Sequence, residues 1–187
     1  ISRVTGGSAS WIDGRIHSGI PNANLYLLNP WGIMFGPDAA VDVGGAFHAS
    51  TADYLRMGEN ERFYAVPLEN EVLTTSPPAA FGFLDNDAEP ITFEGCDIRF
   101  PGKEFTVISG DIELKGAGIT NQSGRLNMVS VASSGEVSLR ESGVDTGALT
   151  GALGDITIIS DAEENPSKVY VRQGSIFIRS GRFVADN

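Results

Sequence analysis

A recurring spacing of short apolar segments constrains the fold of this chain more than any other feature. From Ile91 onward, such segments begin about seven residues apart, and each ends at glycine or a similar breaker. They contain, in order, Ile91/Phe93, Ile98/Phe100, Phe105/Val107, Ile112/Leu114, Ile119 and Leu126/Met128. Three segments make a coil of about twenty residues, and a repeat of that length is typical of a solenoid.

Within the segments, apolar residues alternate with polar ones. In 111–115, Ile112 and Leu114 fall on one face and three charged residues on the other, as in a half-buried strand. After a glycine-rich connection at 142–154, the pattern returns at 156–158, 169–171 and 176–178. Each coil can bury its apolar face only against its neighbours, so the sequence predicts an all-β protein built as a stacked parallel β-helix. A β-sandwich is the alternative, but it would favour tight Asn-Gly hairpins, and few such sequences occur.

The stretch 25–50 contains three short apolar runs separated by turn-forming residues. The runs at 25–28, 33–35 and 41–43 are separated by Asn-Pro-Trp-Gly, Gly-Pro-Asp and Gly-Gly, which predicts three strands joined by turns. In the first turn, Asn29 can bond its own backbone, Pro30 fixes φ, and Gly32 relaxes the fourth position. We therefore expect a type I turn at 29–32. Trp31 should project outward from it.

The remaining segments have weaker signals. Residues 11–16 indicate a strand broken by an Asp-Gly turn. Ser50 and Asp53 have the spacing of a capping box, and Gly58 follows, so we expect a short helical excursion at most. Residues 62–90 lack periodicity and contain several prolines, which predicts a long loop or extra-helical insertion. Its apolar part, 77–84, should pack against the body of the protein.

Composition narrows the class of protein. The 187 residues suffice for one sizeable core, so we expect a single domain over 1–187. A net charge of −11 argues against binding nucleic acid or anionic membranes, which need a basic face. The single cysteine, Cys96, excludes an intramolecular disulfide and a metal site built on cysteines. No transmembrane run is present, and we expect no cofactor.

Two carboxylate pairs are the candidates for catalysis. Parallel β-helices host polysaccharide lyases and hydrolases, which use clustered carboxylates, and the i, i+2 spacing of Asp111/Glu113 and Asp85/Asp87 would place each pair on one strand face. Lys115 follows the first pair on the same face, which favours a solvated charged surface. The second pair lies in an expected loop, where turn chemistry explains both residues. The sequence therefore predicts no catalytic residue.

The histidines are candidates for binding a metal ion, and the aromatic residues are candidates for binding sugars. His17 and His48 are the only histidines, and their separation does not fit a zinc site. Aromatic rings can stack on sugars, which makes a carbohydrate-binding surface an alternative function. The candidate rings are those of Trp11, Tyr26, Trp31, Tyr54 and Tyr64. Of these, Trp31 is the one expected at the surface, because it lies in a turn.

A family resemblance rests on the phrase LLNPWGIMFGPDAAVDVGGAFHAST. It resembles the Asn-Pro-Asn-Gly region of the two-partner-secretion domain, found in filamentous-haemagglutinin-like, TpsA-type exoproteins. ISRVTGGSASWIDGRI, SPPAAFGFL and SGRLNMVSVAS are also similar to that family, especially to its cyanobacterial-type branch. Trp31 stands where the family usually has a second Asn. The resemblance is strong over roughly 1–134 and looser beyond.

The resemblance implies a right-handed parallel β-helix and a non-enzymatic role. It suggests a secretion and folding-nucleation domain of a large adhesin-like exoprotein of a Gram-negative bacterium. An outer-membrane transporter would recognise the domain in the periplasm and export it to the cell surface or medium. A signal peptide and an N-terminal cap precede this region in the family, so we expect that both are missing here. Asn29, Pro30 and Gly32 carry over as the secretion motif.

Two alternatives remain. One is an adhesive module that binds host or neighbouring-cell glycans through Trp31 or Tyr26. The other is a β-helical polysaccharide lyase or hydrolase.

Overall fold

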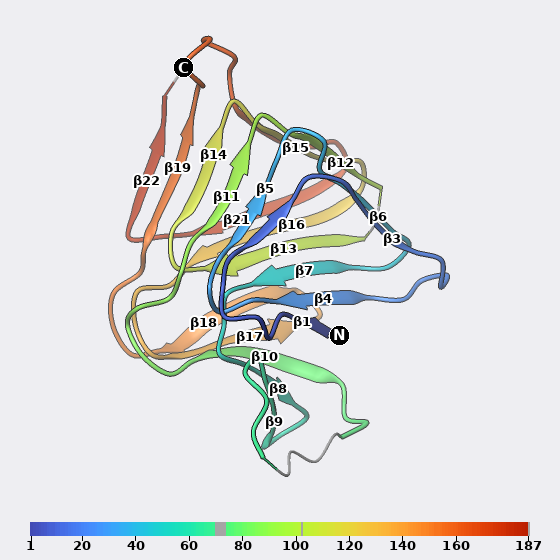
Figure 1. The fold of residues 1–187 in the computed structure, drawn as a ribbon, viewed down its shortest axis with the longest axis vertical. Coiled ribbons are helices and arrows are strands. Elements are labelled where there is room, and N and C mark those ends of the chain that lie inside the picture. The colour runs from blue at the N-terminus through green and yellow to red at the C-terminus, as the bar shows by residue number, and fades with distance from the viewer. Residues whose placement is uncertain (70–73, 102, 187) are drawn as a thin grey trace.

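The computed structural model describes residues 1–69, 74–101 and 103–186, and the regular elements in these ranges are all β-strands (Figure 1). Most of them belong to a solenoid in which the chain visits three sides in a fixed order. Parallel pairing joins each strand to its equivalent in the neighbouring coil. The predicted all-β fold with stacked parallel coils is therefore present.

Two sides of the solenoid are six-stranded parallel sheets. The first sheet contains β1 (Ser2–Arg3), β4 (Leu25–Leu28), β7 (Phe47–Ser50), β13 (Glu104–Ser109), β16 (Gly124–Ser130) and β21 (Gly174–Arg179). The second sheet contains β2 (Ser10–Ile12), β5 (Ile33–Phe35), β11 (Ile91–Glu94), β14 (Ile112–Lys115), β19 (Asp155–Ile159) and β22 (Arg182–Ala185).

The third side consists of two shorter parallel sheets. One pairs β3 (Arg15–Ser18) with β6 (Ala40–Val43), and the other contains β12 (Asp97–Phe100), β15 (Gly118–Asn121) and β20 (Lys168–Val171). β6 lies next to β12, so the two short sheets follow one another along the same side. The strands predicted at 25–28, 33–35 and 41–43 are confirmed as β4, β5 and most of β6.

Because successive coils are aligned in register, side chains of the same type stack on one another inside the solenoid. Ile91 pairs with Ile33 on one side and with Ile112 on the other. The rings of Phe35 and Phe93 stack with centroids 4.8 Å apart and planes 4° from parallel. These side chains belong to one continuous apolar core. The alternation in the sequence reflects this arrangement, because every second residue of a strand points into the coil.

A second, antiparallel layer lies outside the solenoid, at the bottom of Figure 1. We call it the hairpin layer. Its strands are β8 (Tyr54–Met57), β9 (Glu61–Tyr64), β10 (Pro78–Phe83), β17 (Gly135–Arg140) and β18 (Gly143–Leu149), in the order β18-β17-β10-β8-β9. Two excursions build it. Each leaves the first sheet, after β7 or β16, and returns to the second, at β11 or β19.

The hairpin layer corrects several sequence expectations. The helical excursion after Ser50 is wrong, because residues 54–57 form β8, which is hydrogen-bonded to strands on both sides. The expected loop after Arg62 contains β10, and the glycine-rich connection at 142–154 contains β18. Phe81 and Phe83 are buried, which confirms the inward packing expected of 77–84 for these two rings, whereas Leu84 is 56% exposed. Residues 70–73 of the 62–90 insertion lie outside the described residues, and its boundaries stay a prediction.

A second apolar core joins the hairpin layer to the outer face of the first sheet. Leu28 on β4, Ile108 on β13 and Val129 on β16 pack in one cluster with Phe81 and Val137 of the layer. β7 is buried at every position, and so are most positions of β13 and β16. Burial on both faces explains why these segments lack clean alternation in the sequence.

A polar contact ties the two excursions together within the layer. Glu136 on β17 accepts hydrogen bonds from Arg56 Nε at 2.8 Å and from the Tyr54 hydroxyl at 2.9 Å, both on β8. The Arg56 and Glu136 side chains are only about a fifth exposed. A half-buried charge that loses its partner keeps its desolvation cost, so this pair should fix how the two excursions align.

Replacing Glu136 with Ala should lower the free energy of unfolding by about 1–3 kcal/mol, because the mostly buried Arg56 would lose its anionic partner and keep only hydrogen bonds to backbone carbonyls. Urea denaturation of the variant and the parent protein measures the change. Glu163→Ala, at an exposed position, is the control and should change stability little. Equal stability of the Glu136→Ala variant and the parent would contradict this role for the pair.

Candidate functional site

The turn at 29–32 forms the corner where the chain passes from β4 of the first sheet to β5 of the second. The amide of Gly32 donates to the Asn29 carbonyl at 3.2 Å, which closes the turn. The amide of Trp31 donates to Asn29 Oδ1 at 3.0 Å. The structure thus confirms a turn here in which Asn29 bonds its own backbone, as the sequence indicated.

Asn29 also connects its coil to the coils on either side. The side chain is completely buried, and Nδ2 donates to the Ser8 carbonyl at 3.1 Å and to Ser10 Oγ at 2.9 Å, both in the preceding coil. Its backbone amide donates to the Ser50 carbonyl of the following coil at 3.0 Å. The side chain of Asn29 therefore binds the preceding coil and closes its own turn, while its backbone amide binds the following coil.

The backbone conformation favours glycine at the end of this turn. Gly32 has φ of +103°, a conformation that other residues adopt only with strain. An added Cβ would also lie 3.4 Å from the Pro90 carbonyl oxygen and 3.5 Å from Ala9 Cβ. The chain segments before β2 and before β11 thus approach the turn closely.

A second corner repeats this arrangement, which sequence reasoning missed. Asn121, at the end of β15, is also completely buried; its Oδ1 accepts from the Ser123 amide at 3.1 Å and its Nδ2 donates to the Arg125 carbonyl at 3.1 Å. Gly124 follows at the same spacing as Gly32, with φ of +109°. The shared Asn-x-x-Gly spacing was the signal that could have revealed this corner.

Trp31 and Pro30 line a surface cleft of about 230 Å³ beside the turn. Trp31 is half-buried, so the prediction of a fully outward ring holds only in part. The other lining residues are Thr51, Asp53, Val66, Asp85, Asp87, Ala88 and Glu89. Among the described residues, none of the four carboxylates forms an ion pair. Burial raises the pKa of Asp53, and the nearby Asp85 raises it further.

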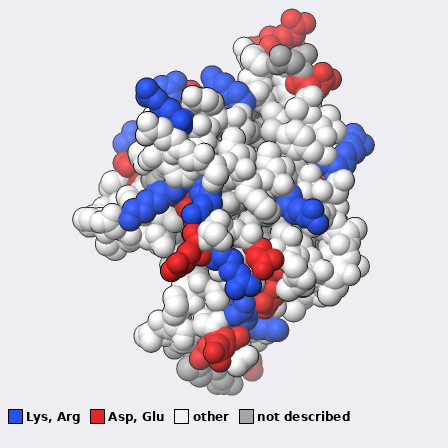
Figure 2. Space-filling model, turned by 180° about the vertical axis from the view of Figure 1, so that it is seen from behind, with Lys and Arg blue, Asp and Glu red and all other residues white. Residues whose placement is uncertain are grey.

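The unpaired carboxylates distinguish the cleft from other parts of the surface. On the face shown in Figure 2, lysine and arginine side chains lie beside aspartate and glutamate side chains. Arg99 pairs with Asp97 at 2.7 Å, for example, and Arg140 with Asp145 at 3.1 Å. That face therefore has no continuous basic surface of the kind that nucleic acid binding needs.

The carboxylate pairs considered for catalysis have structural contacts. Asp111 Oδ1 accepts from the Asp155 backbone amide at 2.7 Å, and Asp85 Oδ1 accepts from the Asp87 amide at 3.0 Å. Glu113 is half-exposed on the outer face of β14. One member of each pair, Asp87 and Asp111, lines a common surface cleft of about 450 Å³ that also contains Glu89. The contacts of Asp85 and Asp111 given above are those of turns and strand ends.

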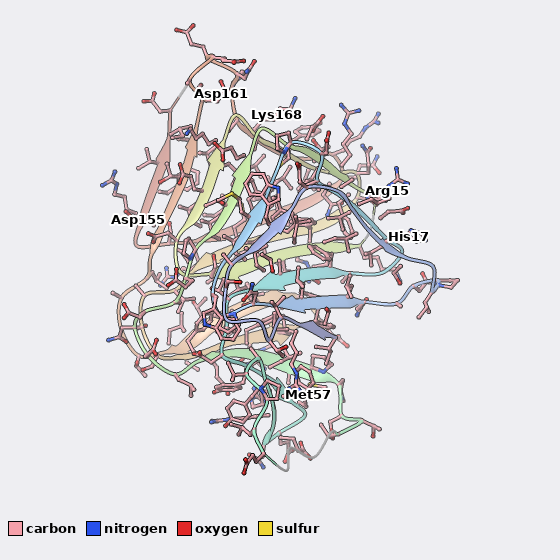
Figure 3. All side chains as sticks on the ribbon, viewed as in Figure 1. Arg15, His17, Met57, Asp155, Asp161 and Lys168 are labelled. Carbon is pink, nitrogen blue, oxygen red and sulfur yellow. The ribbon has the colours of Figure 1, made fainter. Side chains whose placement is uncertain are left out.

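The two histidines lie in different environments. His17 projects from β3 beside Arg15 in Figure 3 and contacts Asp42 at 3.0 Å, whereas His48 on β7 is buried beneath the hairpin layer. The described residues include no group of three or more His, Cys, Asp or Glu side chains placed to hold a metal ion. Within the same part of the chain, no helix has the length and apolar character needed to cross a bilayer.

Tyr26 is not available as a sugar-binding platform. Only 9% of it is exposed, and its ring stacks on that of His48 with centroids 4.4 Å apart. The hairpin layer covers this face of the first sheet, which the sequence did not indicate. Trp11, in contrast, is 58% exposed on the second sheet.

Comparison with known proteins identifies the family. The family model described as "TPS secretion domain" matches residues 1–178, so the chain belongs to this family of two-partner-secretion domains. A heme/hemopexin-binding protein of Haemophilus influenzae is 42% identical over 59 residues, which cover 32% of this chain and 6% of that relative. No solved structure matches the chain. The family is one of secretion domains and not of enzymes.

Asn29→Ala should lower the free energy of unfolding by about 2–3 kcal/mol, because it leaves the Trp31 amide and the Ser8 and Ser10 oxygens without their partner. Asn121→Ala should cost a similar amount, since that corner has the same kind of bonds. Chemical denaturation of both variants, with exposed Gln173→Ala as the control, measures these differences. A cost under 0.5 kcal/mol for Asn29→Ala, the range of ordinary surface substitutions, would show that the corner does not depend on this side chain.

Proposed function

We propose that this domain directs a longer exoprotein to its outer-membrane transporter and starts β-helix folding outside the cell. The destination is the cell surface or the medium of a Gram-negative bacterium, and the exoprotein is adhesin-like. The observation that supports the proposal is the corner at 29–32, whose sequence resembles the family's Asn-Pro-Asn-Gly region and where Asn29 bonds to the preceding coil through its side chain and to the following coil through its backbone amide.

The solenoid supports a stepwise start to folding. Each coil gains its backbone hydrogen bonds and half of its core from the coil before it, so coils can form in the order in which they leave a pore. The final coil, built from β20, β21 and β22, exposes several large apolar side chains. These are Tyr170, Ile176, Phe177, Ile178 and Phe183. We propose that a further coil of the longer exoprotein stacks on them, with right-handed coiling throughout.

The face around Trp31 is the proposed contact for the transporter's periplasmic part. Pro30 and Trp31 line a cleft beside the motif together with four carboxylates, and these carboxylates have no ion-pair partner among the described residues. Exposed strand edges of the domain could add to this contact through β-augmentation. The 59-residue match to the Haemophilus influenzae relative covers too little of that protein to transfer its ligand.

The test compares two variants, each of which loses a buried corner asparagine, in cells that contain the transporter. Asn29→Ala should reduce the extracellular yield of the full exoprotein several-fold, because it disturbs the corner at which we place recognition. Asn121→Ala removes a buried asparagine from a corner elsewhere in the solenoid and should reduce the extracellular yield much less. Immunoblots of medium and periplasm measure both. Normal export of Asn29→Ala, or an equal defect in both variants, would count against a specific role for the 29–32 corner.

A further inference from the structure

A buried histidine lies between the solenoid and the hairpin layer. His48 points outward from β7, where its ring stacks on Tyr26 of β4 with planes 10° from parallel. The ring of Phe81, from β10 of the hairpin layer, lies beside this stacked pair, with its centroid 6.3 Å from that of His48 and 6.3 Å from that of Tyr26. The imidazole is therefore covered by aromatic rings that belong to the two different layers.

One nitrogen of the imidazole has no hydrogen-bond partner among the described residues. His48 is 4% exposed, and its Nδ1 is buried without a hydrogen bond to any described residue. Burial lowers the pKa of His48 from 6.5 to about 4. At neutral pH the ring is thus uncharged, which is the form that an apolar contact between layers tolerates.

The charged and titratable groups near His48 are already engaged or lie at the rim. A cleft of about 280 Å³ borders the ring, and its lining includes Tyr26 of β4, Glu104 of β13, and Arg140 and Glu141 of the layer. Glu104 accepts from Asn127 Nδ2 at 2.7 Å and from Thr106 Oγ1 at 3.1 Å, and it pairs with Arg125 of β16 at 3.6 Å. Arg140 pairs with Asp145, and Glu141 is exposed.

The hairpin layer is built so that it can separate from the solenoid. Its five described strands pair with one another, and none of them pairs with a strand of the solenoid. Side-chain packing in the second core, together with contacts such as the hydrogen bond from Arg3 Nη1 to the Tyr64 carbonyl, holds it in place. Opening the layer would break no backbone ladder of the solenoid.

We propose that the hairpin layer is an acid-sensitive clasp, which lifts from the first sheet when His48 takes up a proton while the coils stay stacked. Opening exposes the imidazole to water and so relieves the cost of a buried, unpaired charge. The closed form binds the proton more weakly than the open form. The stability of the closed form relative to the open form is therefore greatest above pH 6.5 and falls as the pH drops toward 4.

Hydrogen exchange of the full chain, followed by mass spectrometry and expressed as protection factors, tests the clasp. Protection factors remove the direct effect of pH on the exchange chemistry. Between pH 7 and pH 5, protection in β8–β10 and β17–β18 should fall by about 20-fold if the ring regains its ordinary pKa on opening. Protection in β11, β14 and β16 should stay unchanged.

His48→Phe should abolish the pH dependence, because a phenyl ring can stack on Tyr26 beside Phe81 and has no group that takes up a proton. His17→Gln replaces an exposed histidine and is the matched control. This variant should keep the pH dependence of the parent protein. Equal loss of protection in both layers, or a pH dependence that persists in His48→Phe, would overturn the proposal. Should that variant fail to fold, an NMR titration of the parent protein decides: a His48 ring that titrates near 6.5 would contradict the clasp.

Discussion

Parallel pairing between equivalent strands of successive coils is the interaction on which the rest of this structure depends. A single coil has a few short strands and cannot bury its apolar residues alone. Its neighbour supplies both the missing backbone partners and the other half of each stacked pair, as between Phe35 and Phe93. Because the coils must meet in register, the corners that set where each strand begins matter as much as the strands do.

The corners are where polar side chains enter the interior. Asn29 and Asn121 are both completely buried, and both are followed by a glycine with positive φ. A buried amide is tolerated when it is hydrogen-bonded, and both asparagines bond to backbone groups of the chain, with Ser10 Oγ as a further acceptor for Asn29. The corner at 29–32 differs from the other in its position, since it lies beside a surface cleft that contains Trp31.

Much of the solenoid could be predicted from the sequence, because strands with one buried face leave a period of two. Ile112 and Leu114 illustrate this, with charged residues facing solvent between and beside them. The turn at Asn29 was also predictable, because its bonds to its own backbone are local. Its bonds to Ser8 and Ser10 were not, since they depend on the stacking of whole coils.

The hairpin layer escaped prediction for the same reason. Residues 54–57 carry a local signal for a helical turn, but pairing with β10 and β9 makes them a strand. The burial of Tyr26 and His48 depends on β10, which lies more than 25 residues further along the chain. Sequence patterns within a window of about 11–18 residues cannot show that a strand so far along the chain buries these side chains.

The central claim is that this domain serves export through a dedicated transporter. Its most direct test is the extracellular yield of the full exoprotein in cells with and without the transporter gene, with the periplasmic pool measured in parallel. The exoprotein should reach the cell surface or the medium only when the transporter is present. Without the transporter, it should stay in the periplasm or be degraded. An extracellular yield that is the same in both strains would contradict it.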